Sequence, residues 1–360
     1  MGTELDRSTL TLAIDVMGSD QGPSEIIAGC ADAIRGGLKA KLLLVGQERA
    51  IKDAVAEHGL ASDQVVHLYA DGVVAMDDKP ARALRKSRDS SMWAAIEQVK
   101  LGQAHGIVSC GNTGALMAIA RMHLKMIPGV DRPAASALWP TMTGNAVVLD
   151  VGANVEVTAE QLVQFAIMGE AYHRSLSGKE KPAVGLLNVG EEDLKGNTLI
   201  KNAAKVLREA DPEMNFIGFV EGNDISGGEI DVVVTDGFTG NVALKTAEGT
   251  ARLVGGWVKD ALTENMFAKL GAVAMMGPLK RLKARMDPSS VNGAPLLGLG
   301  GLVVKSHGGA DAAGVVSAVK MAEKLAANPF LDEIRRTIAS VSARAQSVEV
   351  DDLEPVAAAE

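Results

Sequence analysis

The stretch VVVTDGFTGNVALKTAEG, residues 232–249, decides the fold of this chain. It begins with β-branched residues typical of a buried strand and becomes polar and glycine-rich at Asp236. Thr239, Asn241 and Lys245 follow at the mouth of a predicted helix. A turn that only reversed the chain would need no such set of side chains. The stretch therefore predicts a strand–loop–helix unit whose loop contacts a ligand.

The same pattern recurs along the chain, with aliphatic runs followed by polar turns and then by helical periodicity. Such repetition predicts βαβ units and an α/β fold with a mostly parallel sheet. Helix starts agree with this pattern, because Pro23 opens one helix and Thr158 with Gln161 forms a capping box at another. The polar loops are DVMGSDQGP (15–23), CGNTGA (110–115), DVGANVE (150–156), NVGEEDLKGN (188–197), DGFTGN (236–241) and KSHGGAD (305–311).

We expect these loops to meet beyond the carboxyl ends of the strands. Helix N-termini there carry unpaired N–H groups and partial positive charge, which favour an anion. Any one loop, taken alone, is better explained as a tight turn between strand and helix. Their convergence is what predicts an anion site.

Composition narrows the class of protein. The chain has 360 residues, of which 47% are hydrophobic and 22% charged, so it can bury a large core. A net charge of −9 argues against nucleic acid as a partner, because phosphate neutralisation needs a basic surface. The two cysteines, Cys30 and Cys110, have no metal or disulfide spacing. The N-terminal residues are too charged for a signal peptide, and no apolar run is long enough to span a bilayer, so we expect a cytoplasmic protein.

Familiar catalytic motifs are missing from the sequence. The chain has no dinucleotide fingerprint, Walker loop, nucleophile elbow or zinc-binding helix motif, which disfavours hydride transfer, nucleotide hydrolysis and zinc chemistry. We therefore predict no cofactor and no metal site. Cys110 could act as a thiol nucleophile, but a small buried residue at a strand end is the favoured interpretation. Lys305 and His307 could bind an anion or donate a proton, or could be solvated loop residues.

A long helical pattern follows Asn241, and Gly277 with Pro278 is expected to break it into a helical hairpin at about residues 242–290. Its stem, with apolar residues at helical spacing, is interpreted as core or as a dimer interface. Its tip is interpreted as a surface for an anionic membrane, because apolar and basic side chains adjoin there. The tip residues are Met275, Met276, Lys280 and Arg281.

A second basic cluster includes Arg82 and Arg85 in KPARALRKSRDSS, residues 79–91. It could dock an acidic partner or form a solvated helix face. A run of charged residues is more often a solvated helix face, which is the favoured interpretation of the cluster alone.

Taken together, these loops, MDDKPARALRKSRDSSM (76–92) and GAPLLGLGGLVVKSHGGAD (293–311) resemble the phosphate acyltransferase family of bacterial phospholipid synthesis. The resemblance covers about residues 10–328. It implies transfer of a long fatty acyl group from acyl carrier protein to inorganic phosphate, giving acyl phosphate for a membrane glycerol-3-phosphate acyltransferase. It also implies a homodimer and a three-layer α/β/α fold similar to isopropylmalate dehydrogenases and phosphotransacetylases.

The resemblance and the loops together assign site residues. Catalytic roles are predicted for Lys305, His307, Asp236 and Asn241. Substrate or phosphate contacts are predicted for Asp15, Gly18, Asn112, Thr113, Gly114, Asn154, Asn188, Thr239 and Lys245. Phosphate is itself the nucleophile, so no protein nucleophile is needed.

Two alternatives and the domain limits complete the expectations. The rival functions are a phosphotransacetylase-like enzyme that uses acyl-CoA and a membrane scaffold that binds an anion without turnover. We expect residues 8–330 to form one α/β catalytic domain, of one or two lobes. Residues 331–345 should form a C-terminal helix and residues 346–360 a flexible tail, with the whole protein attached peripherally to the inner face of the cell membrane.

Overall fold

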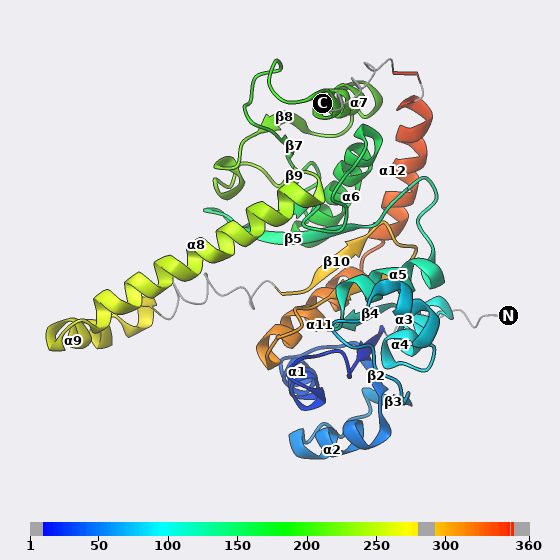
Figure 1. Ribbon diagram of the computed structural model, residues 1–360, viewed down its shortest axis with the longest axis vertical. Helices are drawn as coiled ribbons and strands as arrows, with labels where there is room; N and C mark the ends of the chain where they lie inside the picture. Colours follow the sequence, from blue (N-terminus) through cyan, green and yellow to red (C-terminus); the bar gives the residue numbers. More distant parts are fainter. Residues whose placement is uncertain (1–9, 280–291, 346, 349–360) are drawn as a thin grey trace, which may run out of the picture.

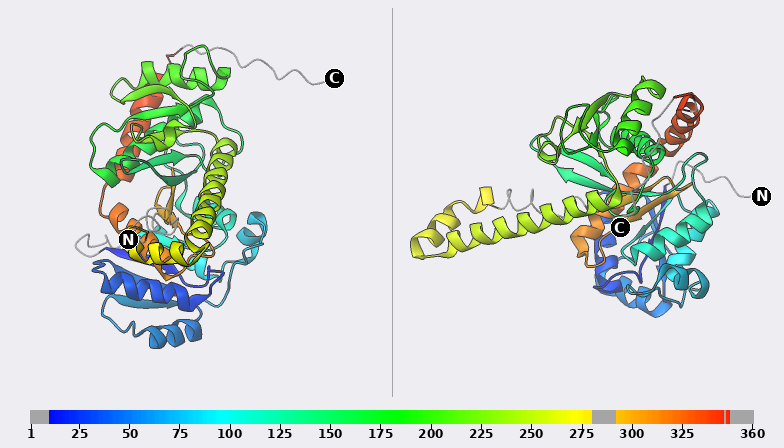
Figure 2. Two further views of the ribbon diagram at one scale, coloured as in Figure 1. Left: turned by 90° about the vertical axis from the view of Figure 1, so that its left-hand side faces the viewer. Right: turned by 45° about the horizontal axis from the view of Figure 1, so that its top comes forward.

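The computed structural model describes residues 10–279, 292–345 and 347–348 (Figure 1). Lys280 and Arg281 of the predicted hairpin tip lie outside the described residues, as does most of the predicted tail. Two lobes stack along the long axis of the molecule, and a helical arm projects sideways from between them (Figures 1 and 2). None of the described helices combines the length and the apolar character that crossing a bilayer requires.

Within the described residues, eleven strands form one sheet in the order β3-β2-β1-β4-β11-β10-β5-β6-β9-β7-β8. Neighbouring strands are parallel except where β10 pairs with β11 and β5, and where β5 pairs with β6. The strands are β1 Thr11–Asp15, β2 Lys41–Gly46, β3 Val65–Tyr69, β4 Gly106–Ser109, β5 Ala134–Pro140, β6 Asn145–Leu149, β7 Val184–Leu187, β8 Phe216–Val220, β9 Val232–Val234, β10 Ala294–Leu297 and β11 Leu302–Lys305.

Helices cover both faces of this sheet, as the βαβ pattern predicts. Pro23 begins α1, and the side chains of Thr158 and Gln161 form the predicted capping box at α6. The helices are α1 Pro23–Arg35, α2 Glu48–His58, α3 Pro80–Lys86, α4 Ser91–Lys100, α5 Thr113–Leu124, α6 Ala159–Ser177, α7 Thr198–Ala210, η1 Asp224–Ser226, α8 Gly237–Thr263, α9 Met266–Ala274, α11 Ala312–Ala326 and α12 Phe330–Ala345.

The buried strands send alternate side chains to two different cores, because successive residues of a strand point to opposite faces. Leu12 and Ile14 of β1 join a core with α1, α6, α11 and α12, whereas Ala13 joins a core with α4 and α5. In the second lobe Val232 of β9 joins the first core and Val233 faces α8. The arrangement confirms the predicted three-layer α/β/α fold.

The sheet changes strand direction at its centre, which the sequence did not predict. Strands β5 and β10 are the antiparallel links, so β4 and β11 run opposite to β6 and β9. In a flat sheet their carboxyl ends would lie at opposite edges. The usual rotation of about 20–25° per strand turns β6 by roughly a quarter-turn relative to β4, so the following loops can face one cleft.

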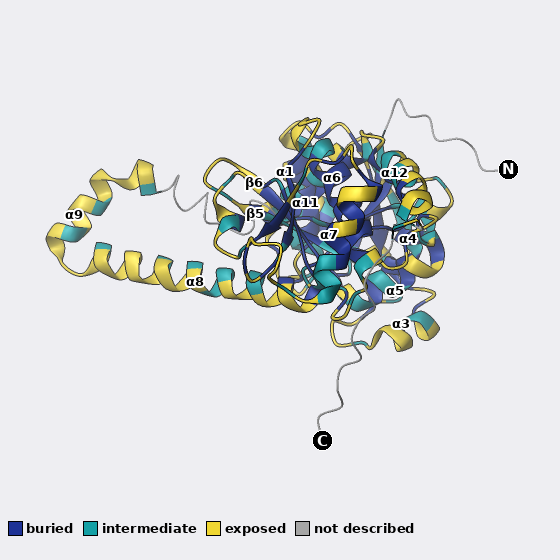
Figure 3. Ribbon diagram, turned by 90° about the horizontal axis from the view of Figure 1, so that it is seen from above, coloured by how far each residue is buried: buried dark blue, intermediate teal, exposed yellow. Residues whose placement is uncertain are grey.

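The arm consists of α8 and α9, and it stands clear of the two lobes (Figures 2 and 3). Helix α8 ends at Thr263, before the predicted break at Gly277 and Pro278, and Asn265 caps α9 by accepting a hydrogen bond from the Ala268 N–H. The break between the two helices therefore lies at Asn265, whose amide side chain favours the start of a new helix, and not at the predicted glycine and proline. Large apolar side chains remain exposed, including Trp257 (62%) and Phe267 (86%).

Helix α12 lies along the second lobe beside α6 and α7 and is held by a buried stripe that includes Ile334 and Ile338 (Figure 1). Ile338 is fully buried, and it packs so closely on Gly129 that a Cβ there would lie 2.8 Å from the Ile338 Cγ2. The helix therefore contributes to the stability of the whole domain.

We predict that Ile338→Ala lowers the free energy of unfolding by about 2–5 kcal/mol, because it removes buried apolar atoms and leaves a cavity. Urea unfolding followed by circular dichroism would measure this change. The control is Ser340→Ala on the exposed face of the same helix, which should unfold like the parent. Equal midpoints for the two variants would contradict the assigned packing.

Candidate active site

The loops after β1, β4 and β11 form the first half of the site. Asp20 N–H donates to the Gly308 carbonyl (2.9 Å), and Ser306 N–H donates to the Ser109 carbonyl (2.9 Å). These bonds join three loops that are far apart in the sequence. They bring Asp15, Gly18, Asn112, Lys305 and His307 of the predicted site into one group.

Asp15 is a buried residue that connects the neighbouring segments of this group by hydrogen bonds. Its buried carboxylate accepts hydrogen bonds from Ser91 Oγ (2.6 Å) and Ser109 Oγ (2.7 Å). Burial raises the pKa of Asp15, and these hydroxyl bonds act in the opposite direction. Gly18 must be glycine here, because a Cβ would lie 2.6 Å from the Asp15 Oδ2 and 2.8 Å from the Gly111 nitrogen. Asp15 thus orders two loops.

The side chain of Asn112 likewise forms hydrogen bonds with other groups of the protein. Its Oδ1 accepts the Ala115 N–H and caps α5, while its Nδ2 donates to the carbonyls of Met76 and Asp78, both at 2.8 Å. The side chain therefore fixes the loop before α3 to the start of α5. The helix N-terminus that it positions belongs to Thr113 and Gly114, whose N–H groups begin the helix.

Lys305 and His307 present donors from the third loop. Lys305 Nζ donates to the carbonyls of Cys110 (3.1 Å) and Ser306, and an ammonium group has a third N–H for a substrate oxygen. Burial lowers the pKa of Lys305, while the nearby Cys110 and Asp15 act to raise it. Gly309 N–H donates to His307 Nδ1 (3.2 Å), which leaves the hydrogen of the neutral imidazole on Nε2 of this exposed ring.

The loop after β6 forms the second half, and Asp150 holds it together. Its Oδ1 accepts the N–H groups of Ala135 and Ala153, and its Oδ2 accepts both the backbone N–H and the Nδ2 of Asn154. Asn154 Nδ2 also donates to the Pro133 carbonyl at 2.8 Å. Burial raises the pKa of Asp150, and the N–H donors counteract this. Asp150 was not among the predicted residues.

The DGFTGN loop packs directly on this second half. Asp236 caps α8 by accepting the N–H and the hydroxyl of Thr239, at 2.8 and 2.7 Å. Gly237 N–H donates to the Asn154 carbonyl (2.7 Å), and a Cβ on Gly240 would lie 1.9 Å from the Asp150 carbonyl oxygen. Only glycine lets α8 approach so closely. The conformation explains the abrupt change of composition at Asp236.

A cavity of about 940 Å³ lies between the two halves. Thr113 and Gly114 line it from the first lobe, and Gly152, Ala153 and Asn154 line it from the second. The predicted loops that follow β4 and β6 therefore face a common space. Other lining residues, which sequence reasoning missed, include Leu84, Met117, Arg121, Met122, Arg132 and Pro133.

Of the predicted site residues, Thr113, Gly114 and Asn154 line this cavity, whereas the predicted catalytic residues are not among its lining residues; these are Lys305, His307, Asp236 and Asn241. Asn188 is buried after β7, where its Nδ2 donates to Gly190 in its own loop (3.0 Å). Lys245 forms an exposed ion pair with Glu248 (3.1 Å) on α8. Within the part of the chain that the structure describes, no side-chain hydrogen bond joins Asn188 or Lys245 to the two loop groups described above, so neither prediction gains support from the geometry.

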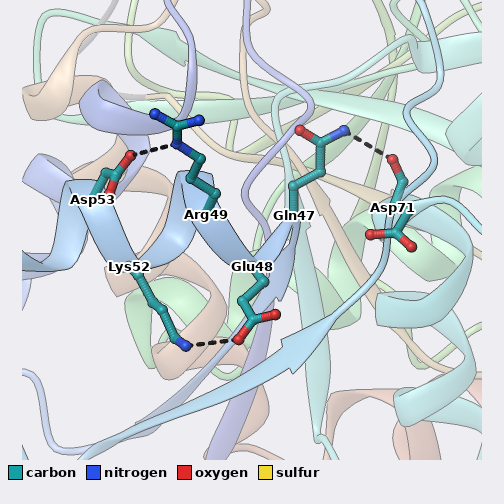
Figure 4. A pocket seen from close by; sticks show the side chains of 6 residues that line it. All are labelled: Gln47, Glu48, Arg49, Lys52, Asp53 and Asp71. Atoms are coloured by element: carbon teal, nitrogen blue, oxygen red, sulfur yellow. Dashed lines mark hydrogen bonds and ion pairs between the residues drawn. The ribbon is translucent and has the colours of Figure 1, made fainter.

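A second hollow lies at the start of α2 (Figure 4). Its charged groups pair with one another, as Lys52 Nζ lies 2.7 Å from Glu48 Oε1 and Arg49 Nε lies 3.5 Å from Asp53 Oδ2. Gln47 Nε2 donates to the Asp71 carbonyl (2.9 Å). These contacts satisfy the lining groups internally, which disfavours this hollow as an anion site.

Asn292 is a further residue that the sequence analysis missed. Its Nδ2 donates to Ser306 Oγ (2.8 Å), and its Oδ1 accepts the His307 N–H (3.1 Å). The residue therefore orients the loop that carries Lys305 and His307. A lone asparagine before a strand gives no distinctive sequence signal, whereas Asp150 could have been found as the acid that ends β6 before a glycine-rich loop.

We predict that Asp150→Asn disrupts the second half of the site, because an amide nitrogen cannot accept the N–H groups that the carboxylate accepts. The variant should lose about 1–3 kcal/mol of unfolding free energy. Urea unfolding followed by circular dichroism would measure this loss. A parental unfolding midpoint would show that this carboxylate does not organise the loop.

Comparison with known proteins shows the family to which the chain belongs. A family model described as "Fatty acid synthesis protein" matches residues 10–332. Curated phosphate acyltransferases from Maricaulis maris and Caulobacter vibrioides are 54% and 50% identical, and these alignments cover 91% and 96% of this chain and 94% and 96% of theirs.

Solved structures give the fold. A phosphotransacetylase from Streptococcus pyogenes has a TM-score of 0.59 at 16% identity, over 89% of this chain and 94% of its own. The EutD phosphotransacetylase from Staphylococcus aureus has a TM-score of 0.58 at 14% identity, over 89% and 96%. These likenesses confirm the expected phosphotransacetylase-like fold. On its sequence relatives, the chain belongs to the phosphate acyltransferase family of transferase enzymes.

Proposed function

We propose that this enzyme transfers a long-chain fatty acyl group from acyl carrier protein to inorganic phosphate, reversibly, to form acyl phosphate. The observation that carries the proposal is the cavity between two polar loop groups, with the N-terminus of α5 on one wall and no cysteine, serine, lysine, histidine or carboxylate among its lining residues. A phosphate oxygen attacks the thioester carbonyl carbon. The C–S bond then breaks, and the departing thiolate takes up a proton.

Phosphate is already anionic near neutral pH, so the protein has to position it and stabilise the tetrahedral oxyanion. The N–H groups of Thr113 and Gly114, the third N–H of Lys305 and the Nε2–H of His307 are suitable donors. We assign phosphate binding to the α5 N-terminus and Lys305, and the oxyanion or the departing sulfur to His307. Asp236, Thr239 and Asn241 would shape the opposite wall.

Cys110 fits this mechanism as a structural residue. Burial raises the pKa of its thiol, and a hydrogen bond with Ser306 acts in the opposite direction. A thiol with a raised pKa is a poor nucleophile at neutral pH. Direct attack by phosphate therefore needs no acylated cysteine.

The rival donor is acyl-CoA, as in a phosphotransacetylase-like enzyme. The basic surface of α3 favours a carrier protein, because Arg82 and Arg85 are exposed beside the cavity wall and an acidic partner needs such a surface. A scaffold without turnover is the remaining alternative. Phosphate-dependent loss of a palmitoyl thioester separates it from both enzymes.

We predict that Lys305→Ala and His307→Ala lower kcat/KM in this assay by roughly 100-fold, the scale of removing one donor to a developing oxyanion. Because the pKa of Lys305 is lowered, its ammonium group should lose its proton at a lower pH than an ordinary lysine does. The activity of the wild type should therefore fall with rising pH before the pH reaches the pKa of an ordinary lysine. Lys305→Arg should move that loss to higher pH, because a guanidinium stays protonated. Unchanged rates and pH profiles in all variants would remove both residues from the mechanism.

The exposed arm suits delivery of a lipid product. Acyl phosphate would be consumed by a membrane glycerol-3-phosphate acyltransferase, so we propose peripheral attachment at the inner face of the cell membrane. Met275 and Met276 are exposed (53% and 46%) beyond the end of α9, near Phe267 in the chain. The stem of α8, with Trp257 exposed, is proposed to pair with a second copy in a homodimer.

We predict that Met275→Glu with Met276→Glu weakens binding to anionic vesicles without lowering soluble turnover, because two charges would enter the apolar contact. Vesicle sedimentation would measure the binding. The control is Met142→Glu, which changes a methionine with 86% exposure at a site far from the arm in sequence. Undiminished sedimentation of the double variant would remove the tip as the membrane contact.

A further inference from the structure

One face of α5 runs along the length of the cavity. Thr113, Gly114, Met117, Ala118, Arg121 and Met122 all line it. The spacing of these residues places them on one side of a helix, and Ile119, Ala120 and His123 are buried on the other side. The cavity is thus a groove that begins at the N-terminus of α5 and reaches its last turn.

The groove changes character along its length. At its start are the N–H groups of Thr113 and Gly114, and about 12 Å further along the helix axis is Arg121. Between them lie Met117 and Ala118, with Leu84 of α3 on the same cavity wall. The middle of the groove is therefore apolar, while its two ends attract negative charge.

Two arginines give the far end its charge. Arg121 and Arg132 are exposed, and no carboxylate is among the residues that line the groove. Among the residues that the structure describes, neither guanidinium forms an ion pair. Pro133, next to Arg132, is fixed to the site because its carbonyl accepts Asn154 Nδ2.

This order of groups distinguishes the two ends of a long thioester. A fatty acyl chain ends in a methyl group, which has no charge and no hydrogen-bond acceptor for an arginine side chain. The phosphopantetheine arm of a carrier protein has a thioester at one end, an apolar dimethyl segment and amides in the middle, and a phosphodiester at the other end. Arginine suits that phosphate because its planar fork can donate two parallel hydrogen bonds.

We propose that the groove binds the phosphopantetheine arm of the acyl donor, with the thioester at the N-terminus of α5 and the phosphodiester on Arg121 and Arg132. The assignment rests on the proposed function and adds the direction in which the donor enters. It places the carrier protein outside the groove, beside α3, where Arg82 and Arg85 extend the cationic surface. Arg121 and Arg132 select a phosphorylated donor.

The test compares one fatty acyl group on three donors: carrier protein, 4′-phosphopantetheine and pantetheine without phosphate. For Arg121→Ala with Arg132→Ala we expect KM to rise by roughly tenfold or more on the two phosphorylated donors. Turnover of acyl-pantetheine should match that of the wild type. Arg121→Lys with Arg132→Lys should recover part of the loss, and Arg49→Ala, on an arginine with 94% side-chain exposure, is the control. Equal losses on all three donors, or no loss, would overturn the assignment.

Two further measurements separate this inference from the proposed function. Direct binding of holo carrier protein should weaken by roughly tenfold in the arginine variant, while binding of the apo form, which lacks the arm, should not change. If the wild type binds the holo form in this way but turns over no donor, the proposed function fails and the groove assignment stands. Arg82→Ala with Arg85→Ala should raise KM for the carrier donor only, and an equal rise with acyl-CoA would overturn the placement of the carrier protein.

Discussion

The reversal of strand direction at β5 and β10 is the constraint on which the site depends. In a wholly parallel sheet, every strand would end at the same edge, and the site would be a row of loops along that edge. Here the two lobes present their loops from opposite strand directions, and the twist of the sheet turns them toward one another. The result is a cleft with two walls, which can hold two reactants face to face.

Most polar side chains of the loops build the walls of this cleft. The side chains of Asp15, Asn112 and Asp150 form hydrogen bonds with hydroxyls, carbonyls and backbone N–H groups of neighbouring loops. Buried carboxylates and amides are stable only when they are paired in this way. The groups left for ligands are backbone N–H groups at a helix start and the donors of Lys305 and His307. A site of this kind suits a reaction whose nucleophile arrives with the substrate.

The arm relates to this site through the chain itself. It leaves the body at Asp236, whose loop packs on the second wall, and the described chain resumes at Asn292, whose side chain orients the loop of His307. Both connections therefore join the arm to loops of the candidate site. The first turns of α8 also pack on the second lobe, because Ala243, Leu244 and Ala247 are partly buried against the core that includes Val233, and the rest of the arm stands clear.

The sequence by itself determined the α/β class, the capping of α6 and the positions of the polar loops that form the candidate site, because each depends on residues that are neighbours in the chain. Hydrophobic alternation, capping pairs and glycine-rich turns act over a few positions and are legible without coordinates. Even locally it was incomplete, because the break in the arm came from Asn265 capping a new helix before Gly277 and Pro278 were reached.

Only the tertiary structure decided the direction of the strands, the supporting role of Asp15, Asn112 and Asp150, and the meeting of α5 with Arg132 and Asn154 across the groove. Strand pairing is chosen by contacts between residues far apart in the sequence. A side chain such as that of Asn112 takes its role from the carbonyls that happen to surround it after folding. The physical reason is the same in both cases: these contacts depend on distances that no local pattern encodes.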